Sequence, residues 1–161
     1  MLFRSNTSAA VSNAAAITED STAPAAPSFA LNSDTGSSNS DNITNDNVIN
    51  VTLAGDVASW EYSLNGGTTW TTGTGTSFSM ASDTSYAIGD IQVRQTDAAG
   101  NTSAAASNAV AITEDSTVAA PSFALNSDTG SSNSDNITND NVINVTLAGD
   151  VASWEIGRAH V

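Results

Sequence analysis

The stretch INVTLAGDVASWEYSL, residues 49–64, decides the fold. Apolar side chains occupy every second position on both sides of a turn at Gly55-Asp56. These positions are Ile49, Val51 and Leu53 before the turn and Trp60, Tyr62 and Leu64 after it. A period of two is that of a strand with one buried face. We therefore predict two consecutive strands, with Glu61 and Ser63 of the second strand facing outward.

Weaker alternation continues on both sides of this stretch. Further short strands are predicted at residues 28–31, 69–71, 78–80, 91–95 and 109–113. In the last of these strands we expect Val110 and Ile112 to point inward. Seven short strands separated by turns within about 100 residues are typical of a β-sandwich. The predicted fold class is therefore all-β, an immunoglobulin-like (Ig-like) β-sandwich in tandem repeats.

The tandem arrangement follows from internal identity. Residues 27–61 recur letter for letter as residues 121–155, at an offset of 94. Residues 6–22 match residues 101–117 at all but two positions, at an offset of 95, so the extra residue lies in the join between units. A period of this length exceeds that of helical solenoids and fits one small β-sandwich.

We therefore divide residues 6–155 into three parts. Residues 6–22 are the tail of a preceding repeat, residues 23–117 are one complete repeat, and residues 118–155 are the truncated start of the next. The truncated unit holds only two or three strands, so we expect that it cannot fold alone. Its edge, which carries Ile143, Val145 and Leu147, should be disordered or pair with another molecule.

Both ends of the chain depart from the repeat. Residues 1–5, MLFRS, and residues 156–161, IGRAHV, back-translate into inverted copies of one sequence that resembles a short-read sequencing adapter. We interpret both segments as adapter scars and leave them out of the fold argument. The alternative is a native start and a divergent tail.

The charge is strongly one-sided. Seventeen acidic residues face three arginines, and only Arg94 lies outside the two adapter segments. Residues 27–120 hold ten acids and this single arginine, a net charge of −9. Such a surface argues against nucleic acid and against anionic membranes as partners, because both require Lys and Arg. It favours bound cations or a screening salt medium.

The residue types also limit the chemistry. The chain has no cysteine, so disulfides and thiolate metal sites are excluded. No apolar run is long enough for a membrane helix, so no membrane insertion is expected. Residues 6–155 contain no His, Cys or Lys, which removes the usual general bases and most covalent nucleophiles. We therefore predict that the repeat is not an enzyme.

Three segments carry a resemblance to a known family. They are DTGSSNSDNITND at residues 34–46, QTDAAGNTS at residues 95–103 and AITEDST at residues 111–117. They resemble the bacterial Ig-like tandem repeats of large secreted surface adhesins, of the biofilm-associated and type I-secreted class. The resemblance implies an extended stalk of identical neighbouring repeats on the bacterial cell surface, often stiffened by Ca²⁺ at its joints. It also implies that other parts of the parent protein bind glycan, host or biofilm surfaces.

Calcium has a separate physical argument. Ca²⁺ takes six to eight oxygen ligands from carboxylates, amides and carbonyls, and the predicted loops are rich in them. In an Ig-like sandwich, the loop after the first strand and the end of the last strand lie at one pole, and the loop between the last two strands lies at the other. The candidate ligands are Asp34, Asp41, Asn42, Asp46, Asp97, Asn101, Glu114 and Asp115. Opposed to this, the same residue types form ordinary turns, and no EF-hand or glycine-rich nonapeptide motif is present.

Two aromatic features invite other interpretations. The segment SLNGGTTW, residues 63–70, resembles an Asp-box hairpin with Asn65 in place of the usual Asp, and we interpret it as a hairpin. Trp60 and Trp70 are the stacking residues that a carbohydrate-binding repeat would use, although the alternation favours a core position for Trp60. A spacer should bury both tryptophans, whereas a glycan binder should leave one ring face exposed. A phage or cell-wall structural repeat would have the same sequence pattern.

Overall fold

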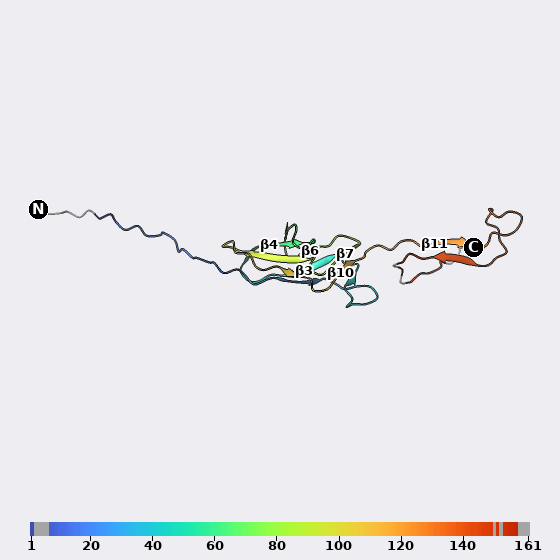
Figure 1. Cartoon of the computed structure of the whole chain (residues 1–161), viewed down its shortest axis with the longest axis horizontal. Helices are drawn as coiled ribbons and strands as arrows, with labels where there is room; N and C mark the ends of the chain where they lie inside the picture. The colour runs from blue at the N-terminus through green and yellow to red at the C-terminus, as the bar shows by residue number, and fades with distance from the viewer. Residues whose placement is uncertain (2–6, 150, 152, 158–161) are drawn as a thin grey trace.

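The computed structural model describes residues 1, 7–149, 151 and 153–157, and every element within them is a β-strand. Figure 1 shows three parts along the long axis: an extended N-terminal tail, a β-sandwich and a separate hairpin. We name the sandwich, residues 23–117, the central unit, and residues 118–155 the half-unit. Of the two predicted adapter segments, only residues 1, 156 and 157 fall within the described part.

Two sheets face each other in the central unit. One sheet has the order β1-β3-β6 and the other the order β5-β4-β8-β9. The strands of the first sheet are β1 (Ser28–Leu31), β3 (Val48–Thr52) and β6 (Ser77–Ser79). Those of the second sheet are β4 (Val57–Ser63), β5 (Thr71–Thr72), β8 (Gln92–Asp97) and β9 (Ala106–Ser107). All pairings within both sheets are antiparallel. The all-β, Ig-like prediction is confirmed.

The core lies between these sheets. Its buried apolar residues are Ile49, Val51, Trp60, Phe78, Met80, Tyr86, Ile91, Val93 and Ile112. The rings of Tyr62 and Phe78 stack across the gap, with their centroids 4.2 Å apart. The indole N–H of Trp60 donates to the carbonyl of Gly75 at 3.0 Å, so this buried polar group is satisfied. The apolar face that the alternation predicted is therefore the face that forms the core.

A small third sheet has the order β2-β10-β7. It consists of β2 (Ile43–Thr44), β7 (Thr84–Tyr86) and β10 (Ile112–Glu114). Strand β2 runs parallel to β10, so the loop after β1 is joined to the end of the unit's last strand. This pairing places the two segments at the same pole, as the predicted topology required.

The strand predictions need three corrections. Ser63 is 2% exposed rather than facing solvent, because the β4–β5 turn folds over it. Val110 is 50% exposed, because the predicted strand at residues 109–113 is interrupted, and only Ile112 enters the core. Strands β2 and β7 were not predicted. Their few residues, such as Thr84-Ser85-Tyr86, carry no apolar alternation.

The half-unit forms a hairpin of β11 (Ser122–Leu125) and β12 (Ile143–Thr146). Its register reproduces that of β1 and β3, with Phe123 opposite Val145 as Phe29 is opposite Val51. Within the described residues no second sheet covers this hairpin, and Phe123 is 79% exposed. That the half-unit cannot fold alone remains a prediction.

The described residues hold no helix with the length and apolar character needed to cross a bilayer.

Candidate functional site

The join that enters the central unit is bound to it by two side chains. Gln95, which is fully buried, donates from Nε2 to the carbonyl of Ala25 at 2.7 Å and accepts at Oε1 from the backbone N–H of Ala54 at 3.1 Å. Asn101 donates from Nδ2 to the carbonyl of Asp20 at 3.0 Å. Pro24 and Pro27 of the join are buried. The chain therefore enters the unit along a path that these residues fix.

Asp97 organises the loop that makes this contact. Its Oδ1 accepts from the backbone N–H groups of Ala99 and Asn101 at 2.9 and 2.8 Å, and its Oδ2 accepts from Asn101 Nδ2 at 2.9 Å. The Asn101 side chain lowers the pKa of Asp97 from its ordinary value, and the backbone donors outweigh the opposing effect of burial. Gly100 has φ +95°, which a side chain would strain. Asp97 therefore works as a turn-forming carboxylate with both oxygens engaged.

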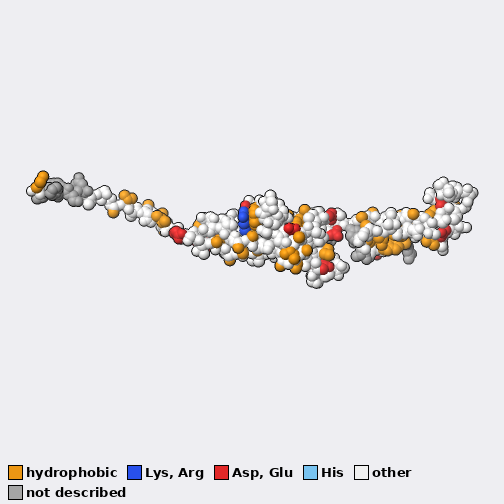
Figure 2. All heavy atoms as spheres, in the orientation of Figure 1, with side chains coloured by type: hydrophobic (Ala, Val, Ile, Leu, Met, Phe, Trp, Pro, Cys, Tyr) orange, Lys and Arg blue, Asp and Glu red, His pale blue; other side chains and the backbone are white. Residues whose placement is uncertain are grey.

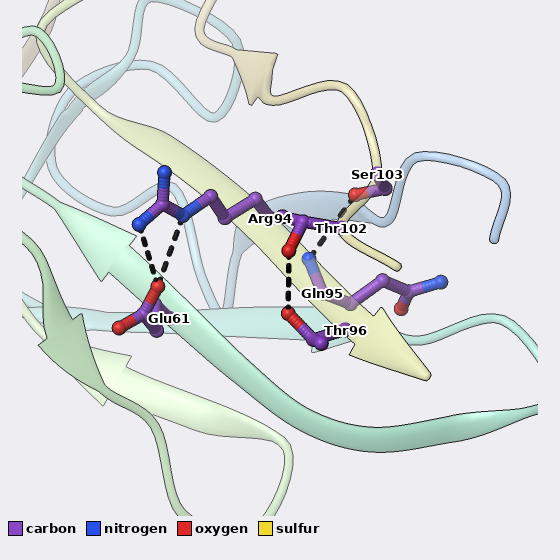
Figure 3. A network of polar contacts seen from close by, with 6 residues as sticks. All are labelled: Glu61, Arg94, Gln95, Thr96, Thr102 and Ser103. Carbon is purple, nitrogen blue, oxygen red and sulfur yellow. Dashed lines mark hydrogen bonds and ion pairs between the residues drawn. The ribbon is translucent and has the colours of Figure 1, made fainter. Parts of the chain in front are cut away.

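The loop is also tied to its own strands. Figure 3 shows Ser103 Oγ beside the backbone N–H of Gln95, which donates to it at 3.1 Å, and the hydroxyls of Thr96 and Thr102 at 3.1 Å. These contacts close the segment between β8 and β9. They hold Asn101 in position toward the preceding chain.

The opposite pole carries the predicted ligands of the first loop. Asp34 Oδ2 accepts from the backbone N–H of Asn42 at 3.0 Å, while Asp34 Oδ1 is buried with no hydrogen-bond partner. Asp41 Oδ1 accepts from the backbone N–H of Ile43 at 3.1 Å. Asn42 adopts φ +63°. In the half-unit, Asp128 repeats the arrangement of Asp34, including the buried oxygen without a partner.

The remaining acids at this pole are engaged by backbone groups. Asp46 accepts from the backbone N–H of Val48 at 3.0 Å and from Asn32 Nδ2 at 2.7 Å. Glu114 is 1% exposed, and its Oε2 accepts from the backbone N–H of Asp83 at 2.6 Å. The backbone N–H of Asp115 donates to the carbonyl of Thr44 at 2.8 Å.

Asp83 anchors the chain where it leaves the unit. Its Oδ1 accepts from the backbone N–H groups of Ser116 and Thr117, both at 3.1 Å, and its Oδ2 accepts from Thr117 Oγ1 at 3.0 Å. The sequence argument missed both Asp83 and Gln95. Gln95 had a signal, because it continues the inward series of Ile91 and Val93. Asp83 lies in no alternating segment and had none.

The predicted ligand set is thus divided between two poles. Asp34, Asp41, Asn42, Asp46, Glu114 and Asp115 lie at the exit pole, and Asp97 and Asn101 lie at the entry pole. Across the described residues, no group of three or more His, Cys, Asp or Glu side chains is placed to hold a metal ion. Asp20 corresponds to Asp115 of the next repeat, and it lies against Asn101. One repeat's exit acids therefore meet the next repeat's entry loop at the joint.

The tryptophans are mainly structural. Trp60 is 4% exposed, and Trp70 is half-buried with the Arg94 guanidinium carbon 4.0 Å from the centre of its ring. Arg94 also donates to Glu61 Oε2 from Nε at 2.9 Å and from Nη2 at 2.8 Å (Figure 3). The predicted core position of Trp60 is confirmed. A glycan-binding repeat needs a bare aromatic face, and one face of Trp70 is already covered.

The segment at residues 63–70 is the hairpin turn between β4 and β5, as predicted. Ser63 Oγ accepts from the backbone N–H of Gly67 at 2.9 Å. Asn65 Oδ1 accepts from the backbone N–H of Thr69 at 2.9 Å, and Asn65 Nδ2 donates to Thr69 Oγ1 at 2.8 Å. Asn65 closes the turn from inside, so the box has a local structural role.

Figure 2 shows acidic side chains scattered along the described surface and blue at a single patch on the central unit. Arg94 supplies the only positive side chain between residues 7 and 157, and it is already paired with Glu61. The surface therefore offers no basic patch for an anionic partner within the described part of the chain.

Comparison with known families agrees with this architecture. The bacterial Ig-like domain family matches residues 18–116, which include all ten strands of the central unit. The chain therefore belongs to the bacterial Ig-like domain family. No curated protein matches the chain.

Proposed function

We propose that this chain is a structural spacer from a large acidic adhesin of the bacterial cell surface. In this role the repeats form an extended stalk that supports cell adhesion or biofilm formation, and they catalyse no reaction. The observation that carries the proposal is the fixed joint: Gln95 and Asn101 hold the entering chain, and Asp83 holds the leaving chain. Bacterial Ig-like domains usually occur in extracellular surface proteins, which supports the proposed location.

A spacer transmits force and orientation, so its joints matter more than its faces. The entry and exit contacts lie at opposite poles, and the identical repeats follow one another without a long linker. Because each repeat contacts only its neighbours, such an array grows in one dimension. The parts that bind glycan, host or biofilm surfaces are placed by this proposal elsewhere in the parent protein.

We further propose that Ca²⁺ stiffens the joints. The support is the buried Asp34 Oδ1, which has no partner, and its recurrence at Asp128. A carboxylate oxygen in this state fits a hard cation, because burial without a partner is costly. Further oxygens at the joint come from Glu114 and Asp115 of one repeat and from Asp97 and Asn101 of the next. When bound, the ion would supply positive charge at a joint that has no basic residue of its own.

Thermal unfolding tests the calcium proposal. The chain is melted in EDTA and in Ca²⁺ from micromolar to ten-millimolar concentration, with NaCl at matched ionic strength as the reference. A specific site raises the unfolding midpoint in Ca²⁺ alone, by about 2.7 kcal/mol at a hundredfold excess over Kd. Equal midpoints in Ca²⁺ and NaCl would remove calcium from the proposal and leave the spacer role intact.

Asp34→Asn is the matched variant, because it keeps the shape of the side chain and removes its charge. The central unit should then lose most of its response to Ca²⁺. Asp56→Asn, at the exposed β3–β4 turn, removes the same charge without touching the first loop and should keep the response. If the two variants respond alike, the ion acts through net charge and not through Asp34.

A further inference from the structure

The half-unit presents an apolar face whose cover is known from the central unit. Phe123, Ile143 and Trp154 are 79%, 49% and 46% exposed. Their equivalents 94 residues earlier are Phe29, which is half-buried, Ile49 at 0% and Trp60 at 4% exposed. The exposed residues line a groove of about 520 Å³ together with Val145 and Pro121. In the central unit this face is part of the core.

The cover in the central unit comes entirely from the second half of the repeat. Ile49 lies opposite Phe78 in the β3–β6 pairing, and β4 pairs with β8. Phe78, Ile91 and Val93 are 7%, 0% and 0% exposed. All of them lie between residues 64 and 117. Because residues 27–61 and 121–155 are identical, this segment matches the half-unit side chain for side chain.

The half-unit is already shaped for this cover. Its strands have the register of β1 and β3. The loop between them keeps its hydrogen bonds: Asn126 Nδ2 donates to Asp140 Oδ2 at 2.8 Å, as Asn32 Nδ2 donates to Asp46 Oδ2 at 2.7 Å. Asn126 and the backbone N–H of Val142 also lower the pKa of Asp140. A preorganised receptor loses less entropy when it binds.

We propose that the β11–β12 face binds the second half of a repeat, residues 64–117, supplied by a second copy of this chain. The product is an Ig-like sandwich completed in trans, in which strands from two chains form one core. The proposal does not depend on calcium. It gives an array of identical repeats a route to link one stalk to another, because any first half fits any second half.

Geometry excludes the same event within one chain. Thr117 is held by Asp83 at the exit pole, whereas a first half that joins the central unit must begin at the entry pole, beside Gln95 and Asn101. The four residues 118–121 span at most about 14 Å. Strand β4 alone, with its 7 residues, covers roughly 23 Å between the poles. Figure 1 shows the hairpin beyond the exit end, in agreement with this argument.

Charge sets the condition for binding. Residues 64–117 carry five acids and Arg94, a net charge of −4, and residues 118–155 carry five acids and no base, a net charge of −5. Like charges repel over about 30 Å at 0.01 M salt and over about 8 Å at 0.15 M salt. Association should therefore be weak at low salt and strong once the charges are screened.

The test adds a synthetic peptide of residues 64–117 to the full chain in about 0.15 M NaCl with EDTA. A free peptide is the suitable probe, because the same segment of a second copy is already paired with its own first half. Starting at Leu64 leaves room for residues 156 and 157 of the chain at the places of Tyr62 and Ser63. Calorimetry should give one peptide per chain with a negative heat-capacity change. Amide resonances of β11 and β12 in ¹⁵N-labelled chain should shift.

Val145→Asp and Thr146→Asp form a matched pair of variants. Val145 corresponds to Val51, which is 5% exposed in the central unit, and Thr146 corresponds to the exposed Thr52 on the other face. The buried aspartate should weaken binding by more than about a hundredfold, and the exposed one by less than about threefold. Both variants leave residues 23–117 unchanged, so the thermal transition of the central unit is the folding control.

Three results would overturn the proposal. They are the absence of peptide binding to the wild-type chain, equal affinity of the Val145→Asp and Thr146→Asp variants, and resonance shifts confined to the central unit. The last result would mean that the peptide exchanges with its own counterpart in residues 64–117. None of these results depends on Ca²⁺, so they leave the spacer proposal and its calcium test unaffected.

Discussion

Gly73 lies against the indole ring of Trp60, and this contact leaves no space for a side chain. A methyl group at Gly73 would overlap Trp60 Cε2 and Cζ2, which are held within the core. The backbone N–H of Gly73 donates to the carbonyl of Trp60 at 2.9 Å, so the backbone is not free to withdraw. We expect Gly73→Ala to lower the free energy of unfolding by about 3 kcal/mol, the upper range for overpacking. Urea unfolding followed by tryptophan fluorescence measures this loss.

Gly55→Ala is the control for that substitution. Gly55 has open space around its Cβ position and no positive φ, so alanine there should change stability by less than about 0.5 kcal/mol. Similar losses for the two variants would show that the contact between Gly73 and Trp60 relaxes without cost.

Asp97 makes a contribution to stability that depends on pH. The side chain of Asn101 and the loop N–H groups hold the pKa of Asp97 below 3.8 in the folded chain. Because this folded-state pKa lies below that of the unfolded chain, the contribution is fully present above about pH 5 and is lost as pH falls through the folded-state pKa. We expect Asp97→Asn to destabilise the unit at pH 7 and to converge on the wild type below about pH 3.

Chemical unfolding of both proteins between pH 7 and acid measures this difference. Acid also relieves repulsion among the other carboxylates, but that effect is common to both proteins and cancels. Asp56→Asn serves as a further reference, because its carboxylate lies exposed in the β3–β4 turn. A gap between wild type and Asp97→Asn that stays constant down to the acid limit would contradict the assignment.

The core residues were largely predictable, because burial in a strand follows a period of two. The pattern predicted Trp60 and Ile112 correctly. It failed at Ser63, whose cover comes from hydrogen bonds of Asn65 and Gly67 in the next turn, and at Val110, where the strand is interrupted. In both places a local turn, which alternation does not describe, decides the exposure.

At the scale of elements, strand β8 ties the entering chain to the sandwich through Gln95. Replacing Gln95 with Leu keeps a similar volume but leaves the Ala25 carbonyl and the Ala54 N–H without their partner. We expect a loss of about 2 kcal/mol, typical of an unsatisfied buried polar group. The amide proton of Ala54 should also exchange with solvent faster. Hydrogen exchange by NMR reads that proton directly.

Gln92→Leu is the matched control in the same strand. Gln92 is half-buried on the opposite face, and its Nε2 donates to the carbonyl of Gly89 at 3.0 Å. This variant should leave the exchange of the Ala54 amide unchanged. If Gln95→Leu also leaves it unchanged, Gln95 does not hold the joint.

The elements themselves were predictable only where they carry apolar alternation. The pairing of β3 with β4 needs seven contiguous polar and apolar positions on each side of a short turn, and the sequence shows them. Strands β2 and β7 form because β10 lies between them, and β10 comes from far along the chain. Their existence depends on the packed sandwich, which no local pattern reports.

The candidate site divides in the same way. The poles of Asp34 and Glu114, and of Asp97, followed from the topology of an Ig-like sandwich. The partners of each oxygen did not follow, because a carboxylate that closes a turn and one that binds a cation have the same sequence pattern. Asp97 closes a turn, whereas Asp34 keeps one buried oxygen free of partners.

At the scale of the whole molecule, a net charge of −14 with no lysine makes self-repulsion the main opposing electrostatic force. The screening length falls from about 30 Å at 0.01 M salt to about 8 Å at 0.15 M, which is shorter than the length of one unit. We therefore expect the unfolding midpoint to rise by several degrees over this range in NaCl. Differential scanning calorimetry measures the rise.

The choice of cation separates this general effect from a specific site. Tetramethylammonium chloride screens as NaCl does but is too large for an oxygen cage built for Ca²⁺, so the two monovalent salts should give the same curve. A midpoint that does not move with either salt would mean that the acids lie too far apart to repel, and charge would then explain neither the extended array nor the resistance of identical repeats to association. If the salt response appears, the charge that keeps the stalks apart at low salt is the same charge that physiological salt must screen before the half-unit face can find a second chain.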